Sequence, residues 1–258
     1  MNGRECLVVF LLWLVPAFFS SIIIHELGHL FFGKLAGYRL IYIRFMFVNL
    51  IKREGKIECS FSIRGPLGQC IMLPSDGKEM PEMLVLGGCL LNVGSAGLFI
   101  LIVFLGILTV RQGGKPEYMT ILILIENAAV NLAAGISNFW FGTETSDGRT
   151  YREIRKNPQN CRSYDNLMRV YACIISGNRL SELPGEMFLP RSVKSSLSAE
   201  LLFYDCVRML EVLESEEAPK EEYVRILERL RIVAGCRHKR IAYEAGELLK
   251  KQKDKIEK

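Results

Sequence analysis

The chain has 258 residues, of which 50% are hydrophobic, and its formal net charge at pH 7 is +5. The mean hydropathy is +0.19, and the apolar residues concentrate before position 143, whereas the remainder is polar and highly charged. This distribution argues against a uniformly soluble protein and predicts a membrane half followed by a water-soluble half. The basic residues lie beside apolar runs and no DNA- or RNA-binding motif stands out, so we expect no nucleic acid among the partners.

The first apolar run extends from Leu7 to Ile24 without a charge and continues to Phe32, before Lys34 ends it. A run of this length can cross the ~30 Å hydrocarbon layer of a bilayer. We therefore expect a transmembrane helix over about 6–33. The alternative is a cleaved signal peptide, although the apolar region of such a peptide has typically only ~7–15 residues.

An HExxH motif, formed by His25, Glu26 and His29, lies towards the end of this run. Histidines four residues apart share one face of a helix and can bind the same Zn²⁺ ion. Glu26 is rotated by ~100° and can reach a metal-bound water, whose pKa the metal lowers toward ~7. We predict His25 and His29 as metal ligands and Glu26 as the catalytic base. The alternative is a hydrogen-bonded polar cluster that joins helices without a metal.

The segment after this run predicts a small β region over about 38–73, at the cytosolic face of the membrane. Arg39–Leu50 and Lys56–Ile63 are rich in Ile, Phe, Tyr and Val, which is typical of short strands. An Arg-Glu-Gly sequence at 53–55 predicts the turn between them.

Two further apolar runs predict transmembrane helices over about 83–110 and 119–142. The second run contains several glycines, which let helices approach closely in lipid. The third run is interrupted by Glu126 and by three asparagines, and such polar groups should face protein or a wet cavity. For Glu126 we consider a charge near the interface or a helix-packing hydrogen bond, and as an alternative a role in a water pathway.

Basic residues flank these runs unevenly. Eight lie between the first two runs and four follow the third directly, whereas only Arg4, Arg111 and Lys115 lie on the opposite side. The positive-inside bias places the N-terminus outside and the C-terminal half in the cytosol.

The third metal ligand should be a His, Asp or Glu on the cytosolic side. Asp147 follows the third run on the same side as His29, so we predict it as this ligand. A surface turn or a helix cap is the alternative for this Ser-Asp-Gly sequence. We interpret His238, in the charged C-terminal region, as a solvated surface residue.

Over roughly residues 6–155 the chain resembles the site-2 protease family of intramembrane zinc metalloproteases. Besides HELGH, the segment Gly87–Asn92 is similar to the family's Gly-Pro-x-x-Asn element, with Cys89 in place of proline. The segment Asn138–Gly148 looks like its Asn-x-x-Pro…Asp-Gly motif, with Phe141 in place of proline. The resemblance implies zinc ligands at His25, His29 and Asp147, the base at Glu26, and substrate-positioning residues at Asn92 and Asn138.

The resemblance also implies a function: a bacterial cytoplasmic-membrane zinc metalloendopeptidase that cleaves membrane-spanning or membrane-associated substrates near the cytosolic face. The substrate helix would unwind, and the β-hairpin could pair with the extended strand by β-augmentation. No PDZ-like or CBS-like domain is evident. The alternatives are a catalytically inactive membrane adaptor that keeps HExxH as structure, and a secreted soluble zinc protease behind a signal peptide.

Residues 151–258 carry helical periodicity, with apolar stripes punctuated by prolines. We expect a cytosolic domain of antiparallel helix pairs that binds a partner or substrate. The eight cysteines form no CxxC pair, so we expect them to be reduced. The predicted fold class is a mainly α membrane protein: a three-helix metalloprotease core over 1–150 with a small β-hairpin region, followed by a soluble all-α domain over 151–258.

Overall fold

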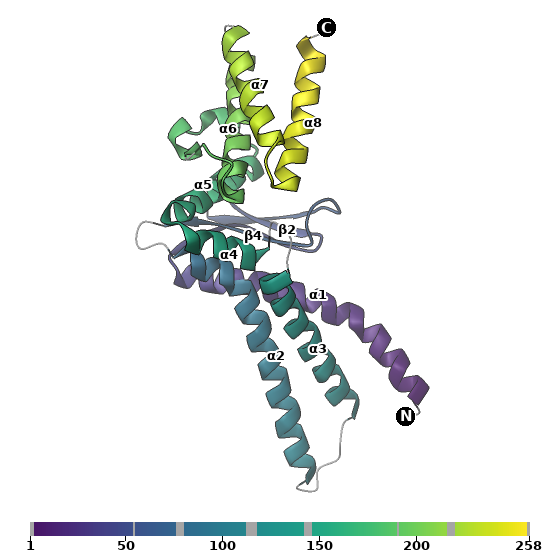
Figure 1. Cartoon of the computed structure of the whole chain (residues 1–258). Helices are drawn as coiled ribbons and strands as arrows, with labels where there is room; N and C mark the ends of the chain where they lie inside the picture. Colours follow the sequence, from purple (N-terminus) through teal and green to yellow (C-terminus); the bar gives the residue numbers. More distant parts are fainter. Residues whose placement is uncertain are drawn as a thin grey trace. The chain divides into compact units, whose positions relative to one another are not determined.

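The computed structural model describes residues 3–53, 55–75, 80–111, 118–141, 146–189, 191–215 and 220–256 (Figure 1). The chain divides into two compact units, Met1–Arg149 and Thr150–Lys258. The first unit contains the apolar helices and one antiparallel sheet, and the second is helical.

Three helices of the first unit are long and apolar enough to cross a membrane. They are α1 (Gly3–Leu35), α2 (Pro81–Arg111) and α3 (Tyr118–Ile136), and a π-helical turn, η1 (Ser137–Phe141), extends the last of them. In the most apolar stretch of 18 residues in each helix, only 17%, 17% and 28% of the residues, respectively, are buried inside the protein. Exposed apolar surface of this extent is typical of helices that face lipid. The expected end of the third span, at position 142, lies outside the described residues.

Helices α1 and α2 cross with their backbones in contact at Gly28 and Gly87. A Cβ added at Gly87 would lie 2.5 Å from the carbonyl oxygen of Gly28, and a Cβ at Gly28 would overlap the carbonyl oxygen of Gly87. Because any larger side chain would separate the two helices, this glycine pair fixes how closely the HExxH face of α1 approaches α2.

The sheet has four antiparallel strands in the order β3-β2-β1-β4, and its β1 and β4 pack against α1. The strands are β1 (Tyr38–Phe45), β2 (Val48–Arg53), β3 (Lys56–Phe61) and β4 (Gly68–Pro74).

One expected strand was wrong, because Arg39–Leu50 is not continuous. It turns at Met46, whose φ is +53°, and Phe45 then pairs with Val48. None of the residues that usually mark a tight turn stands at this position, so the sequence carries no signal for it. The turn expected at 53–55 joins β2 to β3, where Arg53 pairs with Lys56 and Gly55 has φ +81°.

One apolar core, formed by the last three helices, lies in the second unit, and the helices of this unit pack in sequence. They are α5 (Pro158–Ile175), α6 (Ser196–Ser215), α7 (Lys220–Ala234) and α8 (Lys239–Ile256), with two short 3₁₀ turns, η2 (Leu180–Glu182) and η3 (Gly185–Phe188). Leu202, Cys206 and Leu210 of α6 lie in this core, as their helical spacing predicts. The surface interpretation of His238 was wrong, because its side chain is fully buried beside the start of α8.

Candidate metal centre

Two imidazoles project from the same face of α1. His25 and His29 are one helical turn apart, and their rings meet edge to face with centroids 4.8 Å apart. Their Nε2 atoms are 3.2 Å apart. The i, i+4 spacing of the motif thus brings two nitrogen ligands to one point, as the helical geometry predicts.

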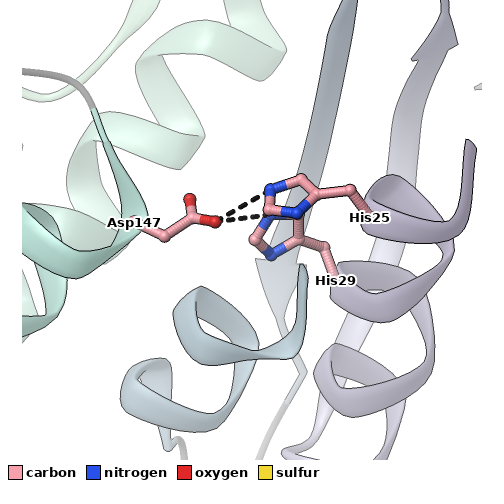
Figure 2. Close-up of side chains that lie close together, drawn as sticks. All are labelled: His25, His29 and Asp147. Carbon is pink, nitrogen blue, oxygen red and sulfur yellow. Dashed lines mark hydrogen bonds and ion pairs between the residues drawn. The ribbon is translucent and has the colours of Figure 1, made fainter. Parts of the chain in front are cut away.

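The carboxylate of Asp147 meets these imidazoles from a distant part of the chain (Figure 2). Asp147 is the first residue of α4 (Asp147–Lys156), and its Oδ2 lies 2.9 Å from His25 Nε2 and 3.3 Å from His29 Nε2. One ligand atom of each residue lies within 4.8 Å of the others, so the three could hold a metal ion. Burial raises the pKa of the Asp147 carboxyl, but the two imidazoles outweigh burial and hold that pKa well below its usual range.

The backbone of α2 fixes which nitrogen of His29 is available. His29 Nδ1 lies 2.8 Å from the carbonyl oxygen of Leu84, which can only accept a hydrogen bond. Nδ1 therefore carries a proton, and Nε2 is the nitrogen that faces Asp147 and is available to a metal. A carbonyl or carboxylate behind a ligating imidazole is the usual arrangement in protein metal sites.

Asn92 of α2 stands behind His25 in the same way. Its side-chain amide lies 3.4 Å from His25 Nδ1 and is buried. With the amide turned so that Oδ1 faces this nitrogen, Nδ1–H donates to Oδ1 and Nε2 keeps its lone pair. Both imidazoles then present Nε2 to the same point.

Asn138, in η1, holds Asp147 in place. Its Nδ2 donates to Asp147 Oδ2 over 2.8 Å and lies 3.0 Å from His25 Nε2, while its Oδ1 accepts from the backbone N–H of Asp147 over 3.4 Å. The contacts of Asn92 and Asn138 are thus with the ligand residues, and a substrate-positioning role for either stays a prediction. The Cys89 thiol also donates to Asp147 Oδ2, over 3.7 Å.

The carboxyl of Glu26, which follows His25 on α1, packs closely against the start of β4. Its side chain is only 5% exposed, and a Cβ added at Gly68, at the start of β4, would lie 3.0 Å from its Cδ. Among the described residues, no group donates to Glu26 Oε2. A buried carboxyl with a free oxygen next to two imidazoles can accept a proton from a water bound at that point.

Sequence reasoning missed two residues that shape the site, Leu84 and Gly88. Leu84 contributes through its backbone carbonyl, which leaves no side-chain signal. A Cβ at Gly88 would lie 2.6 Å from His25 Nε2 and 2.7 Å from His29 Nε2. The Gly-Gly pair at 87–88 was noted only as part of a helix-packing surface and of the Gly-Pro-x-x-Asn resemblance.

We expect Gly88→Ala to weaken metal binding by about tenfold or more, because the added methyl group must displace the imidazoles from their common point. Competition with a calibrated chelator measures the affinity. Gly94→Ala is the matched control on the same helix, because a Cβ at Gly94 meets nothing within 4 Å. Equal metal affinity in the Gly88 variant and this control would contradict a metal at this point.

Comparison of the chain with protein-family models, with curated proteins and with solved structures found no match.

Proposed function

We propose that the protein is an intramembrane zinc metalloendopeptidase of the site-2 protease type. One observation carries the proposal. Two imidazoles on α1 and a carboxylate on α4 present their ligand atoms within 4.8 Å of one another, beside the buried carboxyl of Glu26. The two imidazoles lie on α1, a helix that is long and apolar enough to cross a membrane.

The donor set fits zinc. Two nitrogens and one oxygen are the ligands of many catalytic zinc sites. Ligands about 2.0–2.1 Å from a tetrahedral zinc are about 3.3–3.4 Å from each other. The ligand atoms here are 2.9, 3.2 and 3.3 Å apart, close to that spacing. The side chains of His25, His29 and Asp147 keep 14%, 11% and 18% of their surface exposed, which leaves access for water and a peptide.

Bound zinc would supply a Lewis acid that polarises the peptide carbonyl and acidifies the attacking water. Glu26 accepts the proton of that water and passes it to the amine that leaves. Leu84 holds the tautomer of His29, Asn92 with its amide turned holds that of His25, and Asn138 holds the carboxylate of Asp147. The reaction consumes one water for each peptide bond cut and yields one carboxylate and one amine.

The substrates we propose are membrane-spanning or membrane-associated proteins cut near the cytosolic face. This orientation rests on the excess of Lys and Arg between the first two spans and after the third. The antiparallel sheet, whose β1 and β4 pack against α1, offers strand edges on which an unwound substrate segment could add. The second unit would then lie in the cytosol and bind a partner or the substrate.

The test uses the full-length protein in lipid bilayers, with a panel of fluorescent single-span peptides and metal analysis of the same sample. We expect about one zinc per chain, loss of cleavage with 1,10-phenanthroline, and recovery with Zn²⁺ but not with Mg²⁺. The isomer 1,7-phenanthroline, which does not chelate, is the control. Substrate binding without cleavage by a zinc-loaded sample would favour the inactive adaptor, and iron in place of zinc would contradict a hydrolytic zinc site.

A further inference from the structure

The inward face of α3 is polar, whereas its outward face is apolar. The buried residues of this helix are Glu126, Asn127, Ala128, Asn131 and Gly135. Its large residues Ile125 and Leu132 are 50% and 39% exposed. A helix in lipid turns its polar side chains inward because hydrocarbon cannot hydrogen-bond to them. The polar groups must then find partners inside the protein.

Three acceptor atoms on this face have no protein donor among the described residues. They are both carboxyl oxygens of Glu126, which is 3% exposed, and Oδ1 of Asn131, which is fully buried. The helix-packing hydrogen bond expected at Glu126 is therefore not found among the described residues, whereas the expectation of a charge near the membrane interface stays a prediction. Leaving a buried polar group without a partner costs about 1–3 kcal/mol, so these atoms call for a species that brings its own donors.

Their neighbours continue this polar character. Asn131 Nδ2 donates to the backbone carbonyl of Asn127 over 2.9 Å. The side chain of Asn127 in turn accepts a hydrogen bond from Ser20 of α1, over 3.2 Å. Asn127 Nδ2 also donates to the backbone carbonyl of Ile123, over 2.9 Å. The side-chain amides of Asn127 and Asn131 are thus both anchored, which fixes where Asn131 Oδ1 points.

The polar face leads towards the metal centre. At a rise of 1.5 Å per residue, Asn131 stands about 7.5 Å along α3 from Glu126, and Gly135 about 6 Å further. A Cβ at Gly135 would lie 3.3 Å from Cβ of Asn92, so this point of α3 touches the residue that stands behind His25. With the amide of Asn92 turned as above, its Nδ2 faces away from His25, at a buried point where Oδ1 of the unturned amide meets no donor among the described residues.

We propose that Glu126, Asn131 and Asn92 bind a file of internal water molecules that leads to the metal centre and supplies the water consumed by hydrolysis. The axial rise of about 7.5 Å between Glu126 and Asn131 exceeds the length of one hydrogen bond, so one or two waters would be needed to link them. A water donates two hydrogen bonds and satisfies acceptors that no protein group reaches. The role in hydrolysis rests on the proposed function, whereas the presence of water does not.

Water-edited solid-state NMR of the ¹⁵N-labelled full chain in lipid bilayers tests for the file directly. It measures how fast water transfers magnetisation to each amide. We expect the side-chain amides of Asn131 and Asn92 to respond as fast as that of the exposed Asn178, in the wild type and in the Glu26→Gln variant alike. A response as slow as that of the lipid-facing Ile125 amide would overturn the proposal. If magnetisation transfer from water is fast but the protein cleaves no substrate, the water file is supported and the protease assignment is contradicted.

Kinetics test the supply of water. We expect Glu126→Leu to lower kcat about tenfold at unchanged KM and zinc content, with an equal or higher thermal midpoint because an apolar side chain replaces a buried carboxyl. Glu126→Gln, which still binds water, should keep most of kcat. Ala129→Leu adds the same side chain on the lipid-facing side and should behave as wild type. Wild-type kcat in Glu126→Leu, or a lower thermal midpoint in both Glu126 variants, would contradict a water-binding role.

Discussion

Glu26→Gln is expected to lower kcat about a thousandfold, within the range of 10²–10⁴ typical of general-base removal, while the protein keeps its zinc and its fold. Glutamine has the shape of glutamate and fits the same space against Gly68, but its amide cannot accept the proton of the attacking water. KM should change little, because Glu26 is not expected to contribute to binding of the substrate helix. Cleavage of a single-span peptide by purified variant and wild type, at equal zinc content, measures the effect.

The control for this substitution is Glu247→Gln, at an exposed position of α8, which makes the same chemical change away from the site. It should cleave as the wild type does. If Glu26→Gln cleaves equally well, Glu26 is not the base and the hydrolytic mechanism loses its central residue. If instead the variant loses both zinc and thermal stability, Glu26 holds the site together and the kinetic result says nothing of a base.

The part of the site that is local in sequence could be predicted, because it depends only on helical periodicity. The i, i+4 spacing of His25 and His29 was enough to expect a shared face of α1. The placement of Asp147 was harder, since the contact spans more than a hundred residues and only the positive-inside pattern indicated that both segments reach the same side of a membrane. The distances of 2.9 and 3.3 Å come from the fold alone.

Other features of the fold and the site could not be predicted, because no residue type in the sequence marks them. The Leu84 carbonyl acts through the backbone, and the turn at Met46 lacks the residues that usually mark one. His238 was misjudged because the charged residues around it are typical of a surface, whereas α8 begins beside it and buries its ring. Glu126 could be recognised as unusual from its place in an apolar run, but not as a buried carboxyl without a hydrogen-bond partner among the described residues.

The largest effect on metal binding is expected from Asp147→Ala, which removes one of the three proposed ligands. We expect zinc affinity to fall at least about a hundredfold, more than the 10–100-fold typical of residues behind a ligand. Asn138→Ala, which only frees the carboxylate from its hydrogen bonds, should fall within that smaller range. Zinc competition with a chelator, in the same lipid or detergent for every variant, ranks them.

Ser146→Ala is the matched control, because it changes the neighbouring buried residue and leaves all three ligands in place. Asp147→His is informative in the other direction, since an imidazole can replace a carboxylate as ligand and should restore part of the affinity. If the carboxylate of Asp147 coordinates the metal, Ser146→Ala should bind zinc as tightly as the wild type does, and Asp147→Ala should bind it most weakly. Equal affinity in Asp147→Ala would mean that the carboxylate is only a hydrogen-bond partner of two histidines, and both the metal centre and the protease built on it would fall together.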